Sequence, residues 1–256
     1  MIIKRIIFTV ILFISILHAK TVPKCLLVDE KACLLNNHAE ACYKIGYNYY
    51  LGKDIKRDYV KAKEFFEKSS FLNFPIAFTS LGYMYEKGYG VKKNIEKALE
   101  LYRTGCKKGD GKSCSNIGAY YYYGTLVKKD YIKSMKYQKK ACDLNLSSAC
   151  THVGIYYMEG KGIEKDENKA LNFLDKACKS NFPIACFKAG GIYLNSSELK
   201  DYSKAFKLFE KSCSFGYGLG CYSTAVYYEE IKHEINKSKI FYKNACKYGY
   251  ELGCKN

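Results

Sequence analysis

Cysteine residues recur along this chain at a nearly constant interval of 36 residues. Steps of 36 residues from Cys42 reach Phe78, Cys114, Cys150 and Cys186, and slightly shorter steps then reach Cys221 and Cys254. A second series, eight residues earlier in each unit, contains Ser70, Cys106, Cys142, Cys178, Cys213 and Cys246. A fixed period in the mid-thirties is typical of stacked helical hairpins, in which each unit packs only against its neighbours. The sequence therefore predicts an all-α fold, an α/α superhelical solenoid of helical-hairpin repeats.

The same period divides the chain into a repeat region and short flanking segments. We predict a signal peptide over residues 1–19, an N-terminal capping segment over 20–41 and a C-terminal stub over 254–256. The six repeats fill residues 42–253, and we expect them to start near residues 42, 78, 114, 150, 186 and 221.

The first nineteen residues have the layout of a secretory signal peptide. Two basic residues, Lys4 and Arg5, precede an apolar stretch over 6–17, and cleavage is expected after Ala19. The apolar stretch is too short to span a bilayer, which needs about 20 residues. An uncleaved anchor is the alternative. Cleavage would leave a secreted or periplasmic protein with no transmembrane segment.

Thirteen cysteines behind an export signal predict a disulfide framework in an oxidising compartment. In each joint between repeats, one cysteine lies in the last turn of a helix and the other in the first turn of the next. Antiparallel neighbours joined by so short a turn can bring the Cα atoms within bridging distance. The expected bridges are Cys106–Cys114, Cys142–Cys150, Cys178–Cys186, Cys213–Cys221 and Cys246–Cys254. Zinc sites prefer shorter cysteine spacings, so no metal and no cofactor are expected.

The N-terminal cysteines allow more than one pairing. If the segment from Cys25 to Leu35 is one helix, Cys25 and Cys33 lie about 12 Å apart along its axis, too far to bond. We therefore predict a Cys33–Cys42 bridge and leave Cys25 as the odd thiol, either free or linked to another molecule. The joint at Ser70 and Phe78 has no bridge, so we expect hydrophobic contact to hold it.

Each predicted repeat carries the same internal landmarks. A glycine lies four residues after the start of the first five repeats: Gly46, Gly82, Gly118, Gly154 and Gly190. A tyrosine lies seven residues after every start: Tyr49, Tyr85, Tyr121, Tyr157, Tyr193 and Tyr228. Because an interior glycine costs a helix about 1 kcal/mol, its recurrence indicates close packing against a neighbouring helix backbone. The tyrosine column is expected to fill the core between helices.

The ends of the two helices in each repeat are also marked. Glycines suited to a left-handed C-terminal cap end the first helix near Gly52, Gly88, Gly124 or Gly160. The second helix is expected to start at Asp58, Asn94, Asp130, Asp166, Asp201 and Glu234, of which the first five are good N-caps.

These landmarks resemble Sel1-like repeats, which are related to TPR repeats. The segment 77–88, with its Leu-Gly-Tyr helix and terminal glycine, shows the resemblance well. The Cys-x7-Cys joints are similar to those of the secreted cysteine-rich Sel1-like family, the Hcp proteins. The resemblance covers roughly residues 25–256. It implies an exported, disulfide-clasped repeat protein, possible β-lactam ligands and slow β-lactamase activity, since the family is associated with binding penicillin-type compounds and several members are named as β-lactamases.

No standard catalytic constellation accompanies this resemblance. Ser197 and Lys200 match a Ser-x-x-Lys string, but the Ser-Asp-Asn motif of serine β-lactamases is absent. The histidines His38, His152 and His233 lie in different repeats and predict no metal cluster. The catalytic residues therefore remain unassigned, and the sequence leaves open whether the protein is an enzyme.

A concave face is the predicted binding site. In stacked hairpins the first helix of each unit tends to line the concave side, and the residues two and six places after each start are candidates to point into it. The predicted ligand groove contains Lys44, Asn48, Asn116, Tyr120, His152, Tyr156 and Lys188. Such side chains can bind a carboxylate or a peptide backbone. The alternative is that they are ordinary solvated positions.

We therefore predict an exported, monomeric repeat protein that binds a peptide, a cell-wall fragment or a partner protein through this groove. A penicillin-binding protein with slow β-lactam hydrolysis is the alternative, and a structural spacer is a third reading. The formal net charge of +17 favours acidic partners. The lysines are scattered and mixed with acids, as on solvated helix faces, and no specific nucleic-acid partner is expected.

Overall fold

The computed structural model describes residues 24–53 and 55–255, and every regular element in these ranges is a helix. The predicted signal peptide and the side chain of Cys25 lie outside the described part of the structure. The elements, in chain order, are α2 (Lys24–Asn36), α3 (Ala39–Leu51), α4 (Tyr59–Phe71), α5 (Pro75–Lys87), α6 (Ile95–Lys107), α7 (Gly111–Tyr123), α8 (Tyr131–Asp143), α9 (Ser147–Glu159), α10 (Glu167–Lys179), α11 (Pro183–Asn195), α12 (Tyr202–Ser214), α13 (Gly218–Val226), the π-helical turn η1 (Tyr227–Ile231), α14 (Ile235–Lys247) and the 3-10 turn η2 (Glu251–Lys255). This confirms the all-α hairpin architecture.

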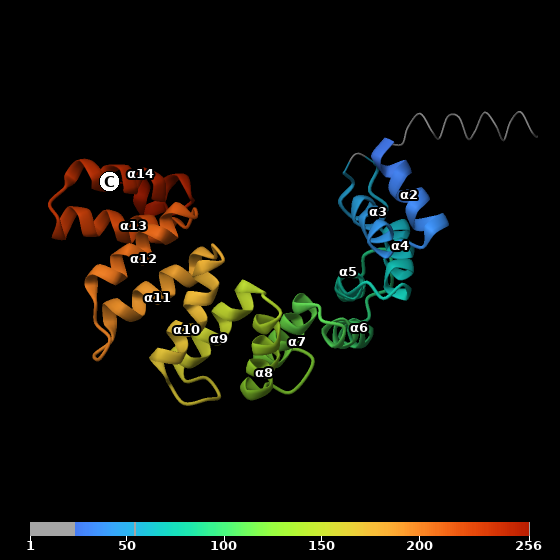
Figure 1. The fold of residues 1–256 in the computed structure, drawn as a ribbon, viewed down its shortest axis with the longest axis horizontal. Coiled ribbons are helices and arrows are strands. Elements are labelled where there is room, and N and C mark those ends of the chain that lie inside the picture. The colour runs from blue at the N-terminus through green and yellow to red at the C-terminus, as the bar shows by residue number, and fades with distance from the viewer. Residues whose placement is uncertain (1–23, 54, 256) are drawn as a thin grey trace, which may run out of the picture. The chain divides into compact units, whose positions relative to one another are not determined.

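The chain forms two compact units, unit 1 over Met1–Ser113 and unit 2 over Cys114–Asn256. Within each unit, successive helices pack against one another as antiparallel neighbours, for example α3 on α4 in unit 1 and α11 on α12 in unit 2 (Figure 1). This local packing is what a solenoid requires, because a single hairpin cannot bury its apolar face alone.

The glycine column accommodates side chains from the second helix of the same repeat. A Cβ added to Gly154 would lie 2.6 Å from Cγ of Leu174 and 3.2 Å from the carbonyl oxygen of Ala170. The equivalent atom on Gly190 would lie 2.7 Å from the ring of Phe209. Close packing is therefore confirmed. The atoms closest to the added Cβ belong to a large side chain of the second helix, and the backbone of that helix, which the sequence predicted as the contact, is slightly farther away.

The predicted helix boundaries follow the capping residues. Gly52, Gly88, Gly124 and Gly160 have φ values from 68° to 79°, the left-handed conformation that ends a helix. Five side chains accept a hydrogen bond from the backbone N–H three residues later, at 2.8–3.0 Å: Asp58, Asn94, Asp130, Asp166 and Asp201. Glu234 makes no such cap. Its weaker capping chemistry explains the difference.

Disulfides close the turns between repeats. The structure contains the bridges Cys33–Cys42, Cys142–Cys150, Cys178–Cys186, Cys213–Cys221 and Cys246–Cys254, with Cα separations of 4.4–4.8 Å. Cys106 and Cys114 are also disulfide-bonded. Each bridge closes a loop of about nine residues, which corresponds to about 2.5 kcal/mol by the chain-entropy model.

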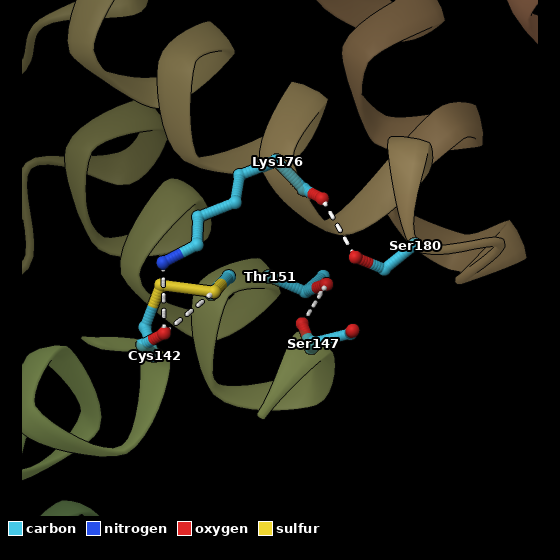
Figure 2. Close-up of a disulfide and its surroundings, with 6 residues drawn as sticks. Cys142, Ser147, Thr151, Lys176 and Ser180 are labelled. Carbon is cyan, nitrogen blue, oxygen red and sulfur yellow. Dashed lines mark hydrogen bonds between the residues drawn. A yellow bond between two sulfur atoms is a disulfide. The ribbon is translucent and has the colours of Figure 1, made fainter. Parts of the chain in front are cut away.

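A lysine joins two neighbouring repeats beside one of these bridges. Figure 2 shows the Cys142–Cys150 bridge with Lys176 of α10 above it. The Lys176 Nζ donates a hydrogen bond of 3.0 Å to the carbonyl oxygen of Cys142, in the last turn of α8. Carbonyl groups at a helix C-terminus lack partners within the helix, so a cation there is favourable.

The joint at Ser70 and Phe78 is held by contacts other than a bridge. The ammonium of Lys108 lies 5.8 Å from the centroid of the Phe78 ring and donates a 2.6 Å hydrogen bond to Oδ1 of Asn73. Lys108 thus contacts both Asn73 and Phe78 at this joint, a feature absent from the sequence-based prediction of hydrophobic contact.

Left-handed residues recur in the turns between repeats. The residue five places before each of the six repeat starts, and before Cys254, has a positive φ of 51–91°, at Asn37, Asn73, Gly109, Asn145, Asn181, Gly216 and Gly249. Asparagine and glycine adopt this conformation more readily than other residues.

Candidate functional site

A cavity of about 1200 Å³ lies within unit 2, in the last two predicted repeats. Its wall comes mainly from three successive helices, α11, α12 and α13, together with the π-helical turn η1. Figure 1 shows these helices following one another toward the C-terminal end of unit 2. Met158 of α9 and the segment containing Lys165 and Glu167 complete the lining.

Aromatic rings dominate the apolar part of the lining, which includes Phe187, Phe206, Phe209, Tyr222 and Tyr227. The rings of Phe206 and Tyr227 stack with a centroid separation of 3.7 Å, and those of Phe187 and Phe209 lie 5.2 Å apart. Aromatic and aliphatic walls with a few placed polar groups are the usual composition of a ligand site.

Gly191 leaves part of the cavity open. No atom lies within 4 Å of the position that a Cβ on Gly191 would occupy. The residues at the same place in the other repeats are Tyr47, Tyr83, Ala119, Ile155 and Val226. The cavity therefore depends on a glycine at a position where most other repeats carry a larger side chain.

The π-helical turn forms one wall. The first helices of four earlier repeats end at a left-handed glycine, whereas α13 continues into η1 over Tyr227–Ile231. Glu229 in this turn accepts a 2.5 Å hydrogen bond from the hydroxyl of Tyr242. Burial, and then the neighbouring Glu229 carboxylate, raise the pKa of Tyr242. Such turns are frequent at functional sites, because they shift the side chains that follow them.

Some charged side chains of the lining form ion pairs or contact aromatic rings, and others do not. Lys165 pairs with Glu167 at 2.8 Å, and this contact, followed by a hydrogen bond from Ser196, holds the pKa of Glu167 below its ordinary value. The Lys232 ammonium lies 5.7 Å from the Tyr227 ring centroid. Lys188 is half-buried, and no hydrogen bond or ion pair joins it to another described residue.

The predicted groove residues do not gather at this cavity. Lys188 alone among the seven lines it. Lys44, in unit 1, pairs with Glu40 of its own helix at 3.0 Å, and Asn48 is half-buried on the same helix. Asn116 and Tyr120 are half-buried on α7.

The prediction that Tyr156 points into a ligand groove is wrong. Its side chain is only 4% exposed, and its hydroxyl lies 2.5 Å from the Ser134 hydroxyl. The position six places after a repeat start faces the packed interface in this repeat, so Tyr156 does not face an open groove. His152 is reached by solvent, but the surrounding protein removes part of its hydration, and this desolvation lowers its pKa.

The tyrosine column lies at the edge of the core, because all six of its tyrosines are half-buried and none is fully buried. Tyr157 stacks on Phe173 with ring planes 10° apart, and the Lys169 ammonium lies 5.7 Å from the Tyr157 centroid. The same lysine pairs with the N-cap Asp166 at 2.9 Å. The Asp-x-x-Lys spacing at the start of α10 could have revealed this lysine from the sequence alone.

The Ser-x-x-Lys string does not lie in the cavity. Ser197 and Lys200 lie in an exposed loop, and the Lys200 ammonium is 5.2 Å from the centroid of the Tyr202 ring. Within the described ranges, no group of three or more His, Cys, Asp or Glu residues could hold a metal ion. No helix in those ranges is both long and apolar enough to cross a membrane.

Comparison with protein families identifies a repeated match along the chain. The family model described as the Sel1 repeat matches residues 39–70, 79–110, 111–146, 147–182 and 183–217. No curated protein matches the chain.

Solved structures show related folds. A Sel1 repeat protein from Oxalobacter formigenes has a TM-score of 0.74 and 25% identity, over 82% of this chain and 88% of its own. A protective antigen of uropathogenic Escherichia coli has a TM-score of 0.75 and 22% identity over 88% of this chain, which spans only 49% of the antigen. Helicobacter pylori cysteine rich protein B is 31% identical over 53% of this chain and 97% of its own, with a TM-score of 0.43.

Proposed function

The chain belongs to the Sel1 repeat family, and from this premise we propose that it is an exported scaffold that binds a segment of a partner protein in the cavity of unit 2. Sel1 repeats generally mediate interactions between proteins. The observation that carries the proposal is the aromatic cavity lined by α11, α12 and α13, which Gly191 keeps open.

The disulfides support the export part of this proposal. Twelve cysteines are disulfide-bonded, at nearly every joint between repeats. Such bonds persist in the periplasm and outside the cell, whereas the cytosol keeps thiols reduced. The signal-peptide pattern over residues 1–19 agrees with this location.

The lining favours a peptide over a cell-wall glycan. Apolar and aromatic side chains of a partner gain binding free energy by leaving water for a wall of rings such as Phe206 and Tyr222. Recognition of a sugar requires many hydrogen-bonding groups directed at its hydroxyls. Several of the polar side chains in this lining are already engaged with other protein groups, as Ser196 and Glu167 are.

A peptide-display selection tests the proposal directly. Random peptides displayed on phage are selected on the oxidised mature protein, and the affinities of the selected peptides are then measured on purified variants. We expect Gly191→Leu to weaken binding roughly tenfold or more, about 1.4 kcal/mol, because the new side chain occupies the cavity. The matched control, Gly191→Ala, should change the affinity much less.

Two outcomes would reject the proposal. One is a selection that yields no peptide with measurable affinity. The other is a set of peptides that bind wild type and Gly191→Leu equally well, since these would bind elsewhere. Thermal unfolding of both variants shows whether a loss of affinity comes from a loss of structure.

The β-lactamase alternative rests on the resemblance alone, and its test is separate. Nitrocefin turnover by the oxidised protein would have to survive repurification and be lost in Gly191→Leu to support it. Turnover that Gly191→Leu leaves intact would place the activity outside this cavity.

A further inference from the structure

We propose that the cavity recognises the free C-terminal carboxylate of an extended peptide, and that Lys188 is the cation that binds this carboxylate. The inference rests on the proposed function, because it names the part of the partner that enters the cavity.

Lys188 and Glu230 are the charged side chains of the lining for which the structure shows no hydrogen bond, ion pair or aromatic-ring contact with a described residue, and Lys188 is the cation of the two. The half-buried Lys188 side chain forms no hydrogen bond or ion pair with the described residues, whereas Lys165 pairs with Glu167 and Lys232 lies against the Tyr227 ring. A carboxylate that enters the cavity would supply a charge-assisted hydrogen bond at this position.

The cavity ends beside Lys188. The lining of α11 begins at Phe187 and that of α13 begins at Tyr222, and neither helix contributes an earlier residue. The two helices run in the same direction, because each is the first helix of its repeat. Lys188 and Ser223 therefore stand at the same register, two residues after their repeat starts. A cation and a hydroxyl at the end of the lining suit the carboxylate at the end of a peptide chain.

The opposite end of the cavity carries an amide and charges of both signs. Asn195 on α11 and Glu230 on η1 also share a register, nine residues after their repeat starts, while Lys232 lies two residues beyond Glu230 and Lys165 pairs with Glu167. The orientation of the peptide therefore rests on Lys188 and not on repulsion at the opposite end. The amide of Asn195, whose Nδ2 donates to Gly191 at 3.0 Å, keeps an oxygen available to accept from a peptide N–H.

The length of the cavity sets the size of the recognised segment. Lys188 and Asn195 are seven residues apart on one helix, which is about 10 Å along its axis. An extended chain advances about 3.3 Å per residue, so about three residues fit between the two ends. The apolar side chains of such a tripeptide would lie against Phe206, Tyr222 and Tyr227.

Matched tripeptide libraries test this inference. One library consists of N-acetyl tripeptides with free carboxyl termini, and the second has the same sequences with C-terminal amides. Binding of each to the oxidised protein is measured at low salt. We expect the free acids to bind wild type at least tenfold more tightly than the amides, and Lys188→Gln to abolish this difference.

Two control variants separate a specific contact from overall charge. Lys188→Arg keeps a cation in place and should retain a preference for free acids. Lys207→Gln removes one charge from the exposed face of α12, outside the cavity, and should leave the preference unchanged. An equal loss of preference in Lys188→Gln and Lys207→Gln would overturn the assignment of Lys188.

Three further outcomes separate this inference from the proposed function. Acids and amides that bind wild type equally would overturn the carboxylate inference, while the selected phage peptides could still bind the cavity. A third library, amidated and carrying internal Asp or Glu, would overturn the C-terminal assignment if it bound equally well through Lys188. If the phage selection also yields no ligand, both proposals fail together.

Discussion

At the scale of single residues, two adjacent glycines of α11 have opposite environments. A Cβ on Gly190 would lie 2.7 Å from the Phe209 ring and 3.0 Å from the Ala205 carbonyl oxygen, whereas a Cβ on Gly191 would meet no atom within 4 Å. We predict that Gly190→Ala lowers the free energy of unfolding by about 1–3 kcal/mol through overpacking. Gly191→Ala should leave it unchanged or raise it by up to about 1 kcal/mol, because alanine is the better helix former.

Urea unfolding of the two variants measures this difference under identical conditions. The pair is self-controlled, since both changes add one methyl group to the same helix. Equal effects at the two positions would contradict the orientation of α11 on α12. The repeat period predicts the packing role of Gly190, which belongs to the glycine column. It does not assign a role to Gly191, because that role is the absence of a side chain beside the packed neighbouring helices.

At the scale of the helices, the N-cap aspartates make stability depend on pH. The backbone N–H of the third helical residue and the ammonium of the same lysine hold the pKa values of Asp130, Asp166 and Asp201 below their ordinary value of 3.8. A lowered pKa in the folded state means that folding favours the ionised form. This contribution is complete above pH about 4 and is lost as the pH falls through the folded pKa values.

We predict that replacing all three aspartates by asparagine makes acid unfolding less steep. Asparagine is also a good N-cap, so the variant should unfold at nearly the same temperature as wild type at pH 7. Below pH about 4, wild type should lose thermal stability faster than the variant, as followed by circular dichroism from pH 7 to 2. Replacement of Asp143 and Asp175, which cap no helix, is the control. Parallel acid curves for wild type and the triple variant would contradict the prediction.

The helix boundaries show which local features of the fold the sequence predicts. Asp166 and Gly160 predicted the start of α10 and the end of α9, because caps depend on local chemistry. The sequence also contains Asn or Gly at the left-handed position of each turn between repeats, a signal that the predicted helix boundaries do not include. The π-helical turn η1 could not be predicted, because it accompanies the stacking of Tyr227 on Phe206, a contact between separate helices.

At the scale of the whole molecule, Lys188 is the single residue of the predicted groove that also lines the observed cavity. The predicted groove residues occupy equivalent positions in successive repeats, whereas the cavity lies where one repeat differs from the others. Gly191, Phe206 and Tyr222 come from three helices, and their proximity depends on how those helices pack. A repeat pattern predicts what the units share, so a site built on a departure from the pattern requires the structure.

The cysteine framework gives a prediction for the entire chain. Twelve of the thirteen cysteines are disulfide-bonded, so alkylation of the unfolded, unreduced protein should label Cys25 alone, or no cysteine if Cys25 is linked to another molecule. All thirteen should be labelled after reduction. Peptide mapping should return bridges between cysteines eight or nine residues apart, because a solenoid keeps distant repeats separate. Labelling of several other cysteines, or bridges between remote repeats, would contradict both the stacking order and the oxidising location that the proposed function requires.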